Sequence, residues 1–270
     1  MAAGGLVTSA KERLTEYMLD RDGLSRELET DLRNGGVYAV FQPLIEIATG
    51  ALVGVEGLCR WSRSRGPAIQ PEVFIPVAEA TGLIHELGRF MLDECLAAAD
   101  QWRTTGRHVE ISVNVSPLQL TTAAFAADLA AKVFERLSTP TALTIEITES
   151  LPLPDLDEIV PRLEELRALE VGVSLDDFGS GHTSVAQLRG LPLTEVKFDR
   201  SLIQSERASD RRTLQDAAAR ARELGLRTVA EGVETSAHLE LAREVGCDRA
   251  QGFLLAAPMH RDVVDAMLRR

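Results

Sequence analysis

The sequence predicts an α/β fold in which about eight strands close into a (β/α)8 barrel, with the first strand antiparallel to the rest. A chain of 270 residues with 45% hydrophobic content fits one domain of the usual barrel size. After an initial hairpin, strand and helix patterns alternate to the end of the chain. An open doubly wound sheet is the alternative that this alternation also allows.

Residues 10–33 form the first predicted helix. Apolar residues recur at helical spacing from Leu14 to Leu32, and Asn34-Gly35-Gly36 ends the pattern. Such a helix either packs on the barrel wall or links the barrel to an upstream domain or a second subunit. We therefore divide the chain into an N-terminal linker helix, residues 1–36, and a main domain, residues 37–270.

Residues 37–47 and 52–61 read as two strands joined by the turn Ala48-Thr49-Gly50. A connection this short makes the pair an antiparallel hairpin. Six further strands are predicted at residues 110–116, 143–148, 171–175, 195–199, 227–231 and 249–254. Helices are predicted at residues 71–79, 85–103, 123–137, 156–169, 184–189, 211–224, 237–245 and 261–268.

The strands share one pattern of alternation. Ile111, Val113 and Val115 alternate with small polar residues, and the strands at 143–148 and 171–175 repeat this pattern. Successive side chains of a strand point to opposite faces, so the polar set is expected to line the barrel interior. Seven strands carry a polar residue of this parity near the end where barrel sites lie. These residues are Glu56, Asn114, Glu146, Asp176, Lys197, Glu231 and Gln251.

Composition restricts the partners. The net charge of −12 argues against binding a nucleic-acid polymer or an anionic membrane surface. No apolar run reaches the length of a membrane span and the start is no signal peptide, so we expect a cytoplasmic protein. The three cysteines, Cys59, Cys95 and Cys247, have no metal or redox spacing, and neither do the five histidines. Hard, oxygen-bound cations are therefore favoured over zinc.

The neighbouring carboxylates Asp176 and Asp177, followed by a Gly-x-Gly loop, indicate a cation site. Five carboxylates and one lysine at these strand ends would be neutralised by two divalent cations, with magnesium or manganese suited to oxygen ligands. Such a pair is used for displacement at phosphorus. Lys197 would position or deprotonate the water, or form only a salt bridge. Arg60 shares the parity of Glu56, so it would hold a phosphate oxygen or pair with the acidic cluster.

At these positions the sequence resembles the EAL domain family, the cyclic di-GMP phosphodiesterases, over about residues 38–269. Each motif alone is weak, but their order along the chain makes the match specific. The motifs are Phe41-Gln42-Pro43, Glu56-Gly57-Leu58-Cys59-Arg60-Trp61, Phe74-Ile75-Pro76, Asn114-Val115-Ser116, Glu146-Ile147-Thr148-Glu149, Asp176-Asp177-Phe178-Gly179, Lys197-Phe198-Asp199, Glu231-Gly232-Val233-Glu234-Thr235 and Gln251-Gly252-Phe253.

The resemblance implies a TIM-like barrel that hydrolyses cyclic di-GMP to linear pGpG with magnesium or manganese. It implies catalytic roles for Lys197, Glu231 and Glu56, with Lys197 acting on the attacking water. The implied metal ligands are Glu56, Asn114, Glu146, Asp176, Asp177 and Glu231. The implied substrate contacts are Gln42, Leu58, Arg60 and Gln251, and Glu149 would support the loop after Asp177. A homodimer and an upstream sensor or GGDEF domain are implied as partners.

Two departures from the family pattern matter. The signature Glu-Ala-Leu reads Glu56-Gly57-Leu58, where the glycine adds backbone freedom. His182 replaces an aromatic anchor in the loop after Asp177, which bears on loop order and on the second metal. A catalytically weak receptor for cyclic di-GMP, or a protein-interaction module, is therefore the alternative function. An unrelated metal-dependent barrel enzyme with Lys197 as base explains the parity but not the ordered motifs.

Overall fold

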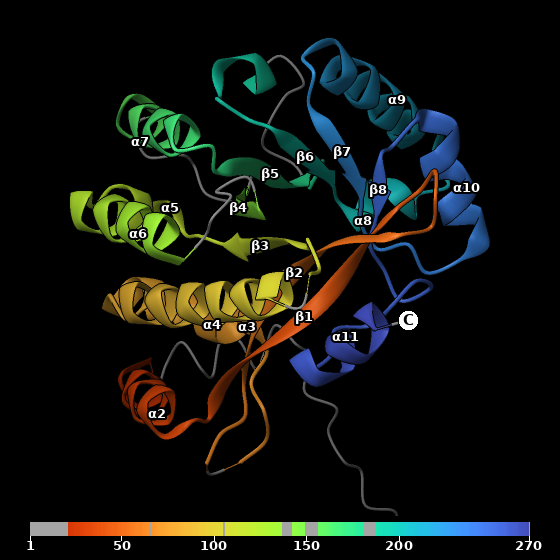
Figure 1. Cartoon of the computed structure of the whole chain (residues 1–270). Helices are drawn as coiled ribbons and strands as arrows, with labels where there is room; N and C mark the ends of the chain where they lie inside the picture. The colour runs from red at the N-terminus through yellow and green to blue at the C-terminus, as the bar shows by residue number, and fades with distance from the viewer. Residues whose placement is uncertain are drawn as a thin grey trace, which may run out of the picture. The chain divides into compact units, whose positions relative to one another are not determined.

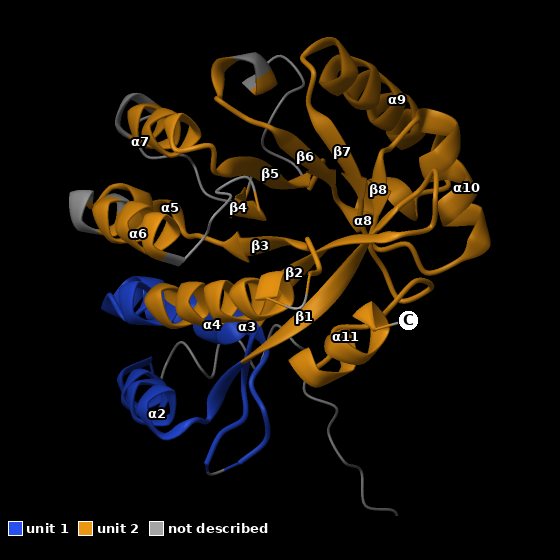
Figure 2. Ribbon diagram, viewed as in Figure 1, with its two compact units in different colours: residues 1–38, 59–87 blue, residues 39–58, 88–270 orange. Residues whose placement is uncertain are grey.

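A computed structural model describes residues 21–64, 66–104, 106–136, 142–148, 156–180 and 187–269. The chain divides into two compact units, coloured separately in Figure 2. The first contains residues 1–38 and 59–87, and the second contains residues 39–58 and 88–270. Strands β1 (Val37–Glu46) and β2 (Leu52–Trp61) contribute residues to both.

Eight strands form a closed barrel in which neighbours follow the chain order. Strand β1 pairs with β8 in antiparallel fashion, whereas each pairing from β2 to β8 is parallel. The remaining strands are β3 (Glu110–Asn114), β4 (Leu143–Thr148), β5 (Gly172–Phe178), β6 (Glu195–Phe198), β7 (Arg227–Ala230) and β8 (Arg249–Ala250). The predicted barrel and its antiparallel first strand are confirmed.

Helices lie outside the strands of the second unit, as α6, α7, α9 and α10 show in Figure 1. Helix α7 packs on β5 and α9 packs on β6 and β7, and Ile111, Ile145 and Val173 are fully buried. The helices of this unit are α5 (Pro117–Leu120), α6 (Ala123–Arg136), α7 (Leu156–Ala168), α8 (Arg200–Ile203), α9 (Ala208–Glu223), α10 (Ser236–Val245) and α11 (Arg261–Leu268), with a 3-10 turn η2 (Gln187–Gly190). Among the described residues, no helix combines the length and apolar character needed to cross a membrane.

The first unit is built on α2 (Arg21–Asn34) and α3 (Pro71–Thr81), which pack against each other. Leu24 and Leu28 of α2 are buried, as the helical spacing predicts. Helix α4 (Ile84–Thr104) begins in this unit and continues in the second. The part of the predicted first helix before residue 21 lies outside the described residues, and the division at residue 36 stays a prediction.

Two strands differ most from their predicted bounds. Strand β5 continues to Phe178, so Asp176 and Asp177 lie within the strand rather than after it. Strand β8 pairs over Arg249–Ala250 alone, although residues 249–254 were expected. The chain turns there because the Gly252 carbonyl accepts hydrogen bonds from the N–H groups of residues 255 and 256. Of the predicted helix at 184–189, the described part begins at residue 187 and is the 3-10 turn.

An ion-pair network occupies the N-terminal ends of β3, β6, β7 and β8. Arg227 pairs with Glu195 at 2.7 Å and with Glu110 at 3.1 Å. Arg249 pairs with Glu110 at 2.8 Å, and Glu195 is buried. Two guanidinium groups thus face two carboxylates, so the charges of these four side chains offset one another.

Candidate active site

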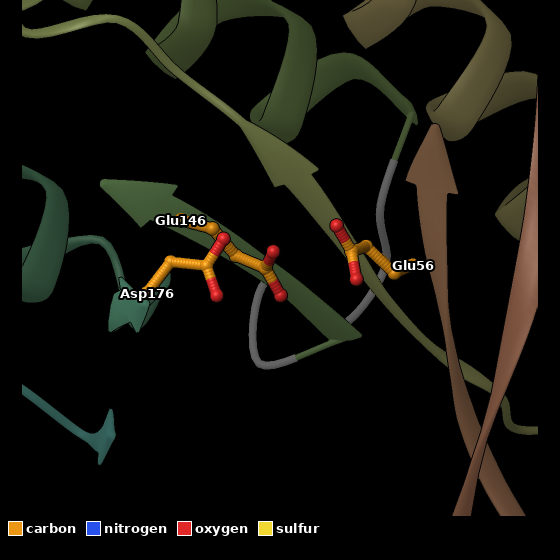
Figure 3. Close-up of side chains that lie close together, drawn as sticks. All are labelled: Glu56, Glu146 and Asp176. Atoms are coloured by element: carbon orange, nitrogen blue, oxygen red, sulfur yellow. The ribbon is translucent and has the colours of Figure 1, made fainter. Parts of the chain in front are cut away.

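The C-terminal ends of the strands bring polar side chains from seven strands together in the second unit. Glu56 lies on β2, Asn114 on β3 and Glu146 on β4. Asp176 and Asp177 lie on β5, Lys197 on β6, and Glu231 and Gln251 directly follow β7 and β8. Figure 3 shows the carboxylates of Glu56, Glu146 and Asp176 turned toward one another. The polar residues that the alternation in the sequence assigns to the interior therefore face the interior of the barrel.

The Lys197 ammonium lies at the centre of this acidic cluster. Its Nζ atom is 3.0 Å from an oxygen of Glu56, of Glu146 and of Asp176. It is 2.7 Å from Oε1 of Glu231. The Lys197 side chain is fully buried. A buried ammonium with three donors thus faces four carboxylates, which is more negative charge than it can balance.

Glu56 is held in place by two amide side chains in addition to Lys197. Asn114 Nδ2 donates to Glu56 Oε1 at 2.8 Å, and Gln251 Nε2 donates to Glu56 Oε2 at 2.9 Å. Burial opposes ionisation of Glu56, but the Lys197 charge and these hydrogen bonds hold its pKa below the ordinary value. Glu56 is therefore a carboxylate, with both oxygens fixed.

The other carboxyl groups shift in the opposite direction. Burial, with the charge of Glu56 beside it, raises the pKa of Glu146 well above its ordinary value. Burial and the charge of Asp176 do the same to the pKa of Glu231. Although burial favours neutral Lys197, the surrounding carboxylates raise the pKa of its ammonium well above the ordinary value. Ionisation of every carboxyl group in the cluster would therefore leave excess negative charge, which a further cation would relieve.

The backbone at Asp177 explains how two consecutive aspartates join one site. Side chains of neighbouring strand residues ordinarily point to opposite faces. Asp177 has a φ of 59°, and the pairing of β5 with β6 shifts register between Leu175 and Phe178. This irregularity brings carboxylate oxygens of Asp176, Asp177 and Glu231 within 4.8 Å of one another. Burial and the charge of Asp176 raise the pKa of Asp177 to about 6.

The donor set fits divalent cations that prefer oxygen. Glu56, Glu146 and Asp176 form a second group whose oxygens lie within 4.8 Å of one another. Oε1 of Glu146 and Oε1 of Gln251 are buried and accept no hydrogen bond from any described residue. Five carboxylates and one ammonium gather at this end, whereas two guanidinium groups face two carboxylates in the network at the opposite end. These residues have the chemistry that magnesium or manganese requires.

The predicted substrate contacts lie on the first two strands. Gln42 on β1 donates through Nε2 to the carbonyl of Ala256 at 3.2 Å. Leu58 on β2 is half-buried. Arg60 belongs to the first unit, where its guanidinium donates to the carbonyl of Cys59 at 2.8 Å. Glu149 and His182 lie outside the described residues, so their predicted roles stay predictions.

Sequence reasoning missed one contact of Gly57, the residue after Glu56. A Cβ atom added to Gly57 would overlap the Sγ atom of Cys95 on α4. The glycine in the signature motif therefore makes room for this buried thiol. No signal in the sequence connects the two positions, because the contact depends on how α4 packs on β2.

Comparison with known proteins agrees with this geometry. The family model of the EAL domain matches residues 25–258. The bifunctional diguanylate cyclase/cyclic di-GMP phosphodiesterase MucR of Pseudomonas aeruginosa is 37% identical over 240 residues, which cover 87% of this chain and 35% of MucR. The cyclic di-GMP phosphodiesterase RocR of the same organism is 31% identical over 263 residues, covering 91% of this chain and 66% of RocR.

A solved structure of the PaMucR phosphodiesterase in complex with c-di-GMP superposes with a TM-score of 0.84 at 36% identity. The match covers 90% of this chain and 99% of that one. The fold, the acidic cluster and these matches define a closed barrel of the EAL type. The chain belongs to the EAL domain family. It spans about a third of the length of MucR, which carries further segments.

Proposed function

We propose that this chain is a cyclic di-GMP phosphodiesterase that hydrolyses one phosphodiester bond to give linear pGpG. The observation that carries the proposal is the excess of carboxylates around Lys197, in a chain of this family. A phosphodiester is an anion, so an uncompensated acidic cluster would repel it. Divalent cations held by the cluster would reverse the sign of its charge, and the described oxygen donors suit such cations.

For the metal site we propose six ligands and two ions of magnesium or manganese. Glu56, Asn114, Glu146 and Asp176 would hold one ion. Asp176, Asp177 and Glu231 would hold the other. When bound, such ions neutralise charge that develops at phosphorus and increase the acidity of water. The two groups share Asp176, which supports a paired arrangement.

For Lys197 the described contacts favour positioning over proton removal. Its Nζ atom donates to the carboxylates of Glu56 and Glu146 at 3.0 Å, and in the metal-free site the surrounding carboxylates raise the pKa of the ammonium. Lys197 would therefore orient the attacking water through an N–H donor and offset charge on the leaving oxygen. Glu56, which is ionised and held by three donors, would take the role of an anchored ligand rather than of a proton donor.

For substrate binding we propose Gln42, Leu58, Arg60 and Gln251. A guanidinium binds phosphate oxygens through two parallel N–H groups, which suits Arg60. Gln251 already donates to Glu56, and its free Oε1 would accept a hydrogen bond from water or substrate. We also propose that the domain acts in the cytoplasm, as a homodimer, downstream of a sensor or GGDEF domain. Residues 1–36 would be its linker.

The direct test is product analysis. The purified chain is incubated with cyclic di-GMP and manganese, then with magnesium, and products are separated by chromatography. We expect linear pGpG from the wild type and none from Glu56→Ala. A chelator should abolish turnover with either metal. Absence of product together with absence of binding would contradict the proposal. Saturable binding without product would instead support the receptor function.

A further inference from the structure

Asp31 is a buried carboxylate far from the acidic cluster in sequence, and the proposed chemistry does not use it. It lies on α2 with 1% of its surface exposed. Its Oδ2 atom accepts from the indole N–H of Trp61 at 2.9 Å and from the backbone N–H of Ser64 at 3.2 Å. Burial opposes its ionisation, but these hydrogen bonds and the Arg63 charge hold the pKa of Asp31 below its ordinary value. A charge is rarely buried without such partners.

The same segment is tied to α2 at two further points. Glu27, one helical turn before Asp31, forms a two-pronged ion pair with the Arg63 guanidinium, with Nε donating at 2.7 Å. The backbone N–H of Ser62 donates to the carbonyl of Gly36 at 2.9 Å. A Cβ atom at Gly36 would overlap the Asp31 side chain, so a glycine is required there. Every residue from 61 to 64 thus has a bond to α2 or to the turn that follows it.

These contacts converge on the end of β2. Trp61 is the last residue of β2, and its ring packs edge-on against Phe74 of α3 at a centroid distance of 5.8 Å. Arg60, the proposed phosphate ligand, directly precedes it. Both belong to the compact unit that contains α2. The residues that directly follow Arg60 are therefore tied to α2 and to the turn after it by hydrogen bonds and an ion pair.

We propose that Asp31 is a positioning residue for Arg60, through which helix α2 sets the affinity of the site for its phosphodiester substrate. The inference rests on the proposed function, and it goes beyond that function by giving α2 a part in substrate binding. Because Asp31 bonds to the residues that follow Arg60 and not to the cluster, its loss should weaken substrate binding and leave metal binding unchanged.

The test compares Asp31→Ala, Asp31→Asn and Glu29→Ala. Glu29 pairs with Arg33 on the exposed side of the same helix at 2.6 Å, so Glu29→Ala removes an ion pair without touching the segment. For Asp31→Ala we expect KM for cyclic di-GMP to rise about tenfold while kcat stays within about twofold. Asp31→Asn keeps an acceptor oxygen and should recover most of the loss. The control should match wild type.

A second readout does not depend on turnover. Trypsin cleaves after arginine when the chain opens locally, and Arg63 is held by Glu27. We expect cleavage at Arg63 to accelerate at least about tenfold in Asp31→Ala and in Glu27→Gln, and not in Glu29→Ala. If Asp31→Ala alters neither this cleavage nor KM, the inference is overturned while the proposed function stands.

Three further outcomes are decisive. A fall in kcat with an unchanged KM would overturn the inference, because it would mean that Asp31 acts on the chemistry. If the wild type shows no turnover, the dissociation constant for cyclic di-GMP measured by calorimetry replaces KM, and the same tenfold difference is required. If the wild type neither binds nor turns over cyclic di-GMP, the proposed function and this inference fall together.

Discussion

The thiol of Cys95 lies in the space that a side chain at Gly57 would fill. Cys95 is fully buried on α4, and Gly57 directly follows the catalytic candidate Glu56 on β2. Helix α4 and strand β2 therefore approach each other more closely here than an alanine at position 57 would allow. Glycine at position 57 and cysteine at position 95 form one packing unit.

This relationship predicts strong coupling between the two positions. Gly57→Ala should destabilise the fold by about 1–3 kcal/mol, because a methyl group is forced into a filled core. Cys95→Ala removes the obstructing sulfur at a smaller cost. The double variant should lose less stability than the sum of the two single losses, by about 1 kcal/mol or more. Urea unfolding of the four proteins measures this, and simple additivity would refute the packing account.

Lys197 should stabilise the metal-free protein. Replacing it with methionine leaves four carboxylates facing one another in a buried site, which should cost about 3 kcal/mol at pH 8 in the presence of a chelator. Manganese should increase the stability of Lys197→Met more than that of the wild type, because no ammonium then competes with the metal cation for the carboxylates. Thermal unfolding with and without manganese measures both effects.

Lys132→Met is a suitable control for that experiment. Lys132 forms a partly exposed ion pair with Asp93 in the second unit, outside the acidic cluster. Its loss should cost less than about 1 kcal/mol and should not change the response to manganese. If the two lysine variants behave alike, the ammonium at the centre of the cluster has no special role.

Asp177 should make the metal-free protein less stable as pH rises. Its folded pKa is raised to about 6 from 3.8, so the folded state prefers the protonated form. The stabilisation of the folded state by this proton is fully present below about pH 4 and is lost as the pH rises through about 6. Asp177→Asn should therefore raise the Tm of the metal-free chain at pH 7.5 and change it little at pH 4.5.

Partial exposure limits that gain to about 1 kcal/mol, or about 2–4 °C. Asparagine also tolerates the positive φ of 59° at this position, so the backbone adds no penalty. In the presence of manganese the order should invert, with wild type the more stable protein. A lower Tm for Asp177→Asn at pH 7.5 without metal would contradict the electrostatic account.

Much of the barrel follows from patterns of period two in the sequence. Ile111, Ile145 and Val173 alternate with polar residues, and the parity of Glu146 and Lys197 already assigns them to the interior. This prediction is possible because each strand pairs with its neighbour in chain order, so local alternation survives in the closed sheet.

Other features depend on contacts that no local pattern encodes. The alternation of side chains along β5 predicts that Asp176 faces the interior and Asp177 does not. The left-handed backbone at Asp177 and the register shift against β6 break this alternation and bring both carboxylates into one site. Glu195 shares the parity of Lys197 but lies at the other end of β6, where Arg227 balances it. Asp31 lies on a helix whose spacing predicts burial but not the indole that it binds.

The measurement that tests the central claim most directly is manganese binding to the chelator-treated chain in the absence of nucleotide. We predict saturable binding, measured by calorimetry, that weakens at least about tenfold in Glu146→Gln and is unchanged in the control Glu110→Gln, whose carboxylate pairs with Arg227 and Arg249. No saturable binding by the wild type, or equal affinity in Glu146→Gln, would contradict a cation site in this cluster.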